Sequence, residues 1–440
     1  MTPFRNFLAV LTVFLFSSSI IGLADVGPST VDQLVKSNEE LRKTVSNLAN
    51  KVEDLEGRLA KAERAPQSIA VGAPAAEGTD GVLRTAGGDI RLDGFVDTSF
   101  NWNFATPNVV PPGNNATGNS TLRAFDRASD TFNLNSVQLN LYRPAPEAGG
   151  VGFRTEFTYG TDAQVIESAG FLGGTDEFSI QEAYAEIKAP IGSGLTVWVG
   201  KFATLLGAEV IENYMNWNAS RSFLFNLAIP FTHTGARAMY SWMDGKVITT
   251  VGLVNGWDLA IDNNKAKDVE AQIKWIPNAN FNVVQNFMGG SQIADDLGDN
   301  RYIFDTVATW VPLPKDLPKL TLMANYDFGY EQRLGAAEKG PADWQGYALY
   351  AKYDYNDWLT FGARWEQFWD DEGVRTGTTG LSDLWEMTYT ADFKVYKNLL
   401  TRLEYRHDYG NSNQVQRGPF DNATQRNQDT VGASLIYLFG

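Results

Sequence analysis

The chain has 440 residues, with 52 Asp and Glu against 36 Lys and Arg, and a formal net charge of −16. That balance argues against binding to a nucleic-acid backbone, which needs clustered cations. The absence of cysteine excludes disulfides, thiolate nucleophiles, iron–sulfur clusters and cysteine-based zinc sites. Only His233 and His407 remain for metal, haem or general-base chemistry, so the composition predicts no cofactor and disfavours an enzyme.

The first 24 residues have the parts of a secretory signal peptide. Arg5 is the only charge before Asp25, an apolar run covers residues 7–16, and small residues precede the end at Ala24. The apolar run is about half the length that a transmembrane helix needs. We therefore predict cleavage after Ala24 and export across one membrane, rather than an uncleaved anchor.

Residues 25–64 are predicted to form a periplasmic coiled coil. From Val31 onward two series of mainly apolar residues repeat every seven positions, and this narrow stripe favours self-association over a helix docked on its own domain. The series are Val31, Asn38, Val45, Val52 and Leu59, and Leu34, Leu41, Leu48, Leu55 and Ala62. Val at one position and Leu at the other favour dimers, and trimers stay open, so we expect a homo-oligomer.

Residues 65–88 are rich in Ala, Gly and Pro and show no periodicity. This composition is typical of a flexible linker. The remaining residues, 89–440, are predicted to form one further domain.

Apolar and polar residues alternate from residue 89 to the end of the chain. In the first segment Leu92, Val96 and Phe100 share one face, while Asp93 and Asp97 share the other. Strict alternation predicts a sheet with one apolar and one polar face. Sixteen such segments start near residues 90, 132, 151, 178, 195, 233, 247, 268, 281, 301, 319, 344, 358, 383, 399 and 429.

The alternation fits either a soluble β-sandwich or a membrane barrel. The segments run about 9 to 13 residues, long enough to cross a bilayer at a tilt, whereas sandwich strands have about five or six. Aromatic residues such as Trp102 and Phe104 gather at strand ends, as in interfacial girdles. A sandwich core could not bury the charges of the polar face cheaply, but a water-filled lumen accepts them. We predict an all-β transmembrane antiparallel barrel of about 16 strands.

The joints between the segments alternate in length, as in an up-and-down barrel. Short joints at 244–245, 277–280 and 356–357 are predicted periplasmic turns. The predicted outer loops are the gaps at 105–131, 160–177, 204–231, 331–343, 370–382 and 410–428. A barrel of sixteen strands is wide enough to leave an aqueous channel.

Four stretches within 90–440 carry a family resemblance. They contain Val-Gly-Lys-Phe at 199–202, Asn-x-Asn-x-Ser-Arg-Ser-Phe at 216–223, Pro-Phe-Thr-His-Thr-Gly at 230–235 and Gly-Leu-Val-Asn-Gly-Trp-Asp from 252. They resemble the OmpL-like putative β-barrel porin family and, more distantly, the phosphate-selective porins. The resemblance implies an outer-membrane porin. Such barrels usually end on an aromatic residue, whereas here Gly440 follows Phe439.

Candidate pore-lining residues are charged side chains in segment 204–231 and on the polar strand faces. Segment 204–231 carries many large apolar residues, which favours a loop folded into the lumen; packing on a neighbouring protomer or capping of the barrel is the alternative. Arg402, Glu404, Arg406 and Asp408 share one strand face, either as a pore-lining series or as a self-compensating network. The candidates are Glu209, Glu212, Arg221, Arg154, Arg237, Arg364, Arg402, Glu404 and Arg406.

The sequence therefore predicts a porin, surrounded by outer-membrane lipid, through which small hydrophilic solutes or ions diffuse passively. A hydrolase would need a base beside a nucleophile, and both histidines fit structural or interfacial roles better. The alternative is a structural outer-membrane anchor whose coiled coil is the working part. We predict no catalytic, cofactor-binding or metal-binding residues.

Residues 31–62 should form a parallel oligomeric coiled coil about 48 Å long, because a helix rises about 1.5 Å per residue. A synthetic peptide of residues 25–66 should be helical by circular dichroism and oligomeric in sedimentation. A peptide that stays monomeric and unstructured at high micromolar concentration would contradict this.

Overall fold

The computed structural model describes residues 81–85, 88–105, 120–169, 177–295, 297–332, 340–377, 380–412, 418–421 and 424–440. The chain divides into two units, 1–70 and 71–440, and every described residue belongs to the second. The predicted signal peptide and coiled coil, and residues 65–80 of the predicted linker, lie outside the described residues.

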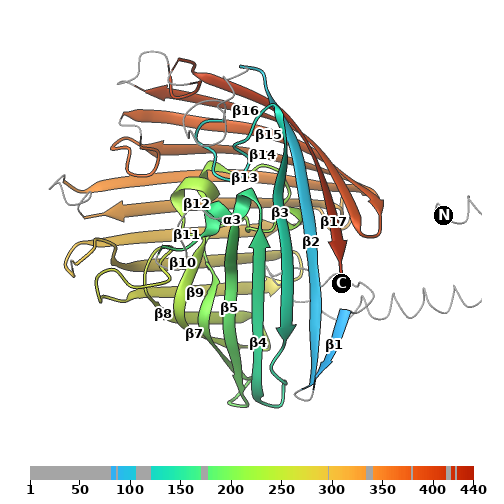
Figure 1. Ribbon diagram of the computed structural model, residues 1–440, viewed down its shortest axis with the longest axis vertical. Helices are drawn as coiled ribbons and strands as arrows, with labels where there is room; N and C mark the ends of the chain where they lie inside the picture. Colours follow the sequence, from blue (N-terminus) through green and yellow to red (C-terminus); the bar gives the residue numbers. More distant parts are fainter. Residues whose placement is uncertain are drawn as a thin grey trace, which may run out of the picture. The chain divides into compact units, whose positions relative to one another are not determined.

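Sixteen antiparallel strands, β2 to β17, close into a barrel (Figure 1). Each strand pairs with the next along the chain, and β17 pairs with β2, so that Phe439 lies opposite Gly94. Closure removes the open sheet edges that would otherwise carry unpaired backbone groups. The strands are β2 (Gly88–Asn103), β3 (Thr131–Arg143), β4 (Gly150–Tyr159), β5 (Phe178–Ala189), β6 (Leu195–Ala203), β7 (Thr232–Trp242), β8 (Val247–Val254), β9 (Asp268–Asn278), β10 (Phe281–Ser291), β11 (Asn300–Trp310), β12 (Leu320–Glu331), β13 (Ala342–Asn356), β14 (Leu359–Asp370), β15 (Leu381–Tyr396), β16 (Leu399–Ser412) and β17 (Asn427–Phe439).

The sixteen strands predicted from the alternation are confirmed. The largest differences in starting position are two residues, as for the predicted start at 90 against Gly88. The period of two is a local property of the sequence, because it records which side of the wall each residue faces.

A seventeenth strand, β1 (Gly81–Thr85), corrects the predicted extent of the linker. It pairs antiparallel with the start of β2, from Gly81 opposite Leu92 to Thr85 opposite Gly88. Since β17 ends opposite Gly94, the first residues of β2 would otherwise present an open edge, and β1 occupies it. The linker prediction was therefore wrong for residues 81–85.

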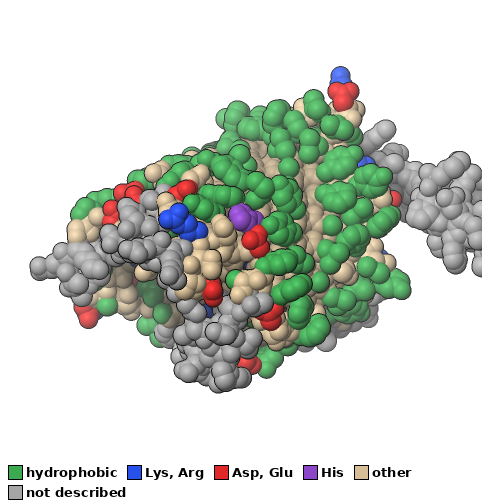
Figure 2. Space-filling view, turned by 90° about the horizontal axis from the view of Figure 1, so that it is seen from above, with side chains coloured by type: hydrophobic (Ala, Val, Ile, Leu, Met, Phe, Trp, Pro, Cys, Tyr) green, Lys and Arg blue, Asp and Glu red, His purple; other side chains and the backbone are tan. Residues whose placement is uncertain are grey.

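The barrel wall is apolar outside and polar inside. Val251, Ile273 and Leu403 are more than half exposed on the outer face, whereas Glu270 and Glu366 are fully buried inside. Figure 2 shows rows of hydrophobic side chains along the outer surface of the strands. This arrangement inverts that of a soluble protein and matches a wall with lipid outside and polar groups inside.

Aromatic pairs lie near both ends of the wall. The rings of Trp102 and Phe104 stack at 5.1 Å where β2 ends, and those of Trp275 and Phe281 lie 6.3 Å apart at the opposite end, between β9 and β10. Such pairs form the girdles at the two membrane–water interfaces.

The three predicted turns join β7 to β8, β9 to β10 and β13 to β14, all at one end of the barrel. In the first, Met243 and Asp244 have positive φ values of 52° and 54°, as in the tight turns that match the twist of a hairpin. The long connections lie at the other end and hold α3 (Thr161–Ile166), a 3₁₀ turn η1 (Asn213–Met215) and a π-helical turn η2 (Leu224–Ala228). No helix of the described part of the chain is long and apolar enough to cross a membrane.

Gly94 lies at the closing seam, so Gly94→Ala should weaken barrel closure. A Cβ there would lie 2.0 Å from the Gln138 carbonyl oxygen and 2.7 Å from the Phe439 ring. We expect a loss of about 1–3 kcal/mol and a lower temperature for loss of the folded form on SDS gels. Gly340→Ala is the control, because its Cβ would meet no atom within 4 Å. Equal heat resistance of the two variants would contradict a tight seam.

Candidate functional site

Residues 204–231, between β6 and β7, fold into the barrel interior and are called the lumen loop here. Three hydrogen bonds tie the loop to widely separated parts of the wall. Ala208 N–H donates to Asn325 of β12 at 3.1 Å, Asn213 Nδ2 to Asp97 of β2 at 2.8 Å, and Asn218 Nδ2 to Thr390 of β15 at 2.8 Å. The loop therefore spans the lumen and does not extend into solvent.

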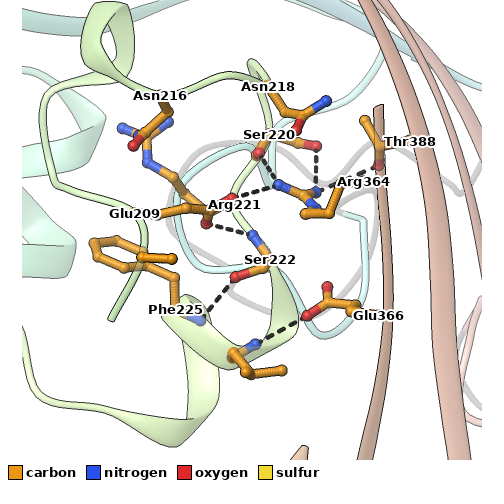
Figure 3. Close-up of polar contacts among 12 residues, drawn as sticks. Glu209, Asn216, Asn218, Ser220, Arg221, Ser222, Phe225, Arg364, Glu366 and Thr388 are labelled. Atoms are coloured by element: carbon orange, nitrogen blue, oxygen red, sulfur yellow. Dashed lines mark hydrogen bonds and ion pairs between the residues drawn. The ribbon is translucent and has the colours of Figure 1, made fainter. Parts of the chain in front are cut away.

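Arg364 of β14 joins the lumen loop to two wall strands (Figure 3). Its Nη1 donates to Glu209 Oε1 and to the Ser220 carbonyl, each at 2.7 Å, and its Nε donates to Glu386 Oε1 of β15 at 2.6 Å. The Arg364 side chain is 0 % exposed. A buried guanidinium with two carboxylate partners is strongly bound, and loss of either partner would leave a buried charge unpaired.

Two carboxylates of the wall bind backbone N–H groups of the lumen loop. Glu404 of β16 accepts hydrogen bonds from Ala219 at 2.6 Å and Ser220 at 2.8 Å. Glu366 of β14 accepts from Phe223 and, at 3.2 Å, from Leu224. These bonds satisfy backbone donors that lack partners within the loop. The donors of Phe223 and Leu224 lie at the start of η2.

Two arginines of β16 bind backbone carbonyls of the same loop. Arg402 donates to the Asn213 and Asn216 carbonyls at 2.7 Å and pairs with Asp392 at 3.0 Å. Arg406 donates to the Arg221 carbonyl at 2.5 Å and pairs with Asp408 at 2.6 Å. The four charges from Arg402 to Asp408 thus compensate one another only in part: the lumen loop binds Arg402, Glu404 and Arg406, and Asp408 also pairs with Arg123.

The apolar residues of the lumen loop form a small core inside the barrel. Phe223 and Leu224 are fully buried, and the Phe225 ring lies 5.7 Å from that of Phe125. Trp344 of β13 donates from Nε1 to the Ala228 carbonyl at 3.1 Å. Burial of apolar surface contributes about 25 cal/mol per Å², which explains why a lumen segment carries so many large apolar groups.

Parts of two predicted outer loops also turn inward. Arg123, from the described part of 105–131, donates to Asp408 of β16 at 2.6 Å. Ile166 of α3, from the gap at 160–177, is 1 % exposed. These segments bury apolar side chains and pair charges with the inner wall, and such stabilisation is not open to loops surrounded by water.

Arg221 lies within the folded lumen loop. Its guanidinium donates to the backbone carbonyls of Val210, Ile211 and Ala219 and sits 5.0 Å above the Phe125 ring. The residue is 1 % exposed, so its charge holds the loop together and does not face open water.

Three predicted site residues lie apart from the Arg364 contacts. Arg237 of β7 forms two 2.8 Å bonds with Glu270 of β9. Glu212 accepts a hydrogen bond from Gln181 of β5. Arg154 of β4, whose side chain is 33 % exposed, pairs with Glu156 and Glu182. The structure brings together the other six, namely Glu209, Arg221, Arg364, Arg402, Glu404 and Arg406.

The end of the lumen loop is fixed by Asp258, in the connection between β8 and β9. Its Oδ1 accepts hydrogen bonds from Phe231 and Thr232 at 2.8 and 3.0 Å. Burial raises the pKa of Asp258, and these two N–H donors oppose that rise. His233 lies beside them, with its ring nitrogens 3.1 Å from the Gly256 carbonyl and from Thr204.

Several residues of the site were not selected from the sequence. Glu366 and Glu386 lie on polar strand faces, so the alternation marks them as inward, but nothing local distinguishes them from other inward carboxylates. Arg123 and Asp162 lie in gaps without alternation and carry no signal. Within the described ranges, no group of three or more His, Asp or Glu residues could hold a metal ion.

The barrel matches a known protein family over most of its length. The family described as "Putative beta-barrel porin-2, OmpL-like" matches residues 89–439. The chain belongs to this family. Proteins of this porin family and fold are typically non-enzymatic channels, and membership supports a location in the bacterial outer membrane. A search of curated protein sequences finds no match.

Solved structures of outer-membrane channels share the fold of this porin. The channel DcaP of Acinetobacter baumannii superposes with a TM-score of 0.56 at 12% identity, over 81% of this chain and 99% of its own. The anion-selective porin of Comamonas acidovorans gives 0.51 at 13%, over 80% and 99%. OmpF of Salmonella typhi, solved with daunomycin, gives 0.51 at 12%, over 81% and 100%. At these identities the likeness shows the fold alone.

Arg364→Gln should release the lumen loop from the wall. The substitution leaves the buried carboxylates of Glu209 and Glu386 without their shared cation, which costs about 3–5 kcal/mol. We expect a lower unfolding temperature and faster proteolysis within 204–231. Arg91→Gln, at an exposed position of β2, is the matched control and should change neither. If both variants resisted heat and protease equally, Arg364 would not anchor the loop.

Proposed function

We propose that this porin forms an outer-membrane channel for passive diffusion of small hydrophilic solutes or ions, with the lumen loop as its constriction. The observation that carries the proposal is a loop held across the lumen by wall side chains such as Arg364 and Arg402. A sixteen-stranded wall alone would leave a wide pore, and a fixed loop narrows it to a defined size.

Eight of the nine charged candidates, all except Arg237, divide into two proposed roles. Glu209, Arg221, Arg364, Arg402, Glu404 and Arg406 set the width of the constriction by positioning the loop, because their charged groups are bound to it or to the wall. Arg154 and Glu212, on the β4 and β5 side, contact passing solutes. The one-third exposure of Arg154 supports that role.

A structural outer-membrane anchor is the second candidate. It is favoured by the dense packing of the lumen, where Arg364, Glu366, Glu386 and Asp408 are at most 1 % exposed. A filled lumen would suit a barrel that only holds residues 25–64 at the membrane. In that case oligomerisation through the predicted coiled coil would be the working property of the protein.

Planar-bilayer recordings distinguish the two functions. The purified, exported protein should give stepwise conductance if it is a channel. Glu404→Gln weakens the acceptor for Ala219 and Ser220, so it should increase open-channel noise or conductance, while the control Arg91→Gln should not. Silent preparations that still show the heat-resistant folded form would overturn the channel and favour the anchor.

A further inference from the structure

A cavity remains between the lumen loop and the wall built by β2, β3, β16 and β17. Its volume is about 30 Å³. A water molecule needs about 10–15 Å³ measured in the same way, so the cavity has room for about two or three particles of that size. Four carboxylates line it: Asp97 of β2, Asp126 of the segment 120–130, Asp162 of α3 and Glu404 of β16, which already accepts hydrogen bonds from the lumen loop.

Two carboxylates of this cavity, Asp97 and Asp126, each have a buried oxygen without a hydrogen-bond partner. Asp97 is 0 % exposed, and its Oδ2 accepts from Asn213, but its Oδ1 accepts no hydrogen bond. Asp126 Oδ2 pairs with Arg123 at 2.8 Å, and its Oδ1 is likewise unpartnered. Unsatisfied buried oxygens are costly and therefore point to a ligand that the protein atoms do not supply.

Two arginines, Arg123 and Arg221, border the cavity. Arg123 pairs with Asp126 and, at 2.6 Å, with Asp408 of the wall. Arg221 donates to backbone carbonyls of the lumen loop. The four carboxylates of the lining, when ionised, outnumber these two guanidinium groups, so the formal charge of the lining is negative.

The surroundings of Asp162 hold its carboxyl toward the neutral form. Burial raises the pKa of its carboxyl well above the ordinary value, Asp97 and Asp126 raise it further, and Arg221 opposes the rise. A positive charge inside the cavity would stabilise the ionised carboxylate.

We propose that the cavity lined by Asp97, Asp126 and Asp162 is a subsite for a small monovalent cation, either an alkali ion or the ammonium group of an amine. Ser434, whose Oγ also has no hydrogen-bond partner, adds a neutral oxygen. The described carboxylates do not converge as a directly coordinated metal would need, which favours a singly charged, partly hydrated occupant. This subsite rests on the proposed channel function and makes that channel cation-selective.

Reversal potentials in asymmetric KCl test the subsite. Wild-type channels should prefer K⁺ over Cl⁻, and Asp162→Asn should reduce that preference about fivefold, as expected for one lost charge near the permeating ion. Recordings between 0.3 and 1 M salt screen distant surface charges but not a buried one. Asp162→Glu should keep the preference. Asp316→Asn, on an exposed turn between β11 and β12, is the matched control and should also keep it.

The outcomes separate this subsite from the channel function. A silent wild-type protein would overturn both. A conducting wild type that prefers Cl⁻, or an Asp162→Asn channel with unchanged selectivity, would overturn the subsite and leave the channel. If Asp162→Asn fails to fold, Asp126→Asn measures the same negative surplus. Repeating the reversal-potential measurements in ethylammonium chloride distinguishes an alkali ion from an amine as the occupant. If Asp162→Asn changes selectivity in KCl but not in ethylammonium chloride, the subsite takes inorganic ions.

Discussion

The buried guanidinium groups of the inner wall are the constraint on which the lumen loop depends. A guanidinium taken out of water must find partners for its donors, and the wall carboxylates supply only some of them. Arg402 and Arg406 also donate to backbone carbonyls of the loop, while Glu404 accepts the loop's N–H groups. The wall and the loop therefore supply hydrogen-bond partners to each other, and either one alone would leave buried polar groups unpaired.

This mutual dependence explains the composition of the loop. Its polar backbone faces charged side chains of β14 and β16, and its apolar side chains collapse on Phe125 and Trp344. The wall itself is inverted, with apolar groups toward lipid, so the lumen is where this barrel builds a conventional core. That core is small and rests on directional bonds, which fixes one conformation of the loop.

The sequence predicted the wall much better than the site. Strand starts such as Leu195 and Leu399 follow from alternation, because facing lipid or lumen is decided residue by residue. The partners inside the barrel do not follow, since Glu209 and Arg364 are 155 positions apart and Ala219 and Glu404 are 185 apart. Such contacts depend on closure of the whole barrel. For the same reason the carbonyl partners of Arg221 could not be predicted from its neighbours in the sequence.

Hydrogen–deuterium exchange of the lumen-loop amides tests the central claim most directly, since a loop held by the wall must protect its N–H groups. In the folded, detergent-solubilised protein, the amides of Ala219, Ser220 and Phe223 should exchange about as slowly as those of β16. Each of these N–H groups donates a hydrogen bond to a carboxylate of the inner wall. Glu404→Gln should speed exchange at Ala219 and Ser220 first. Exchange of all three wild-type amides as fast as in the exposed turn at 313–318 would contradict a loop fixed inside the barrel.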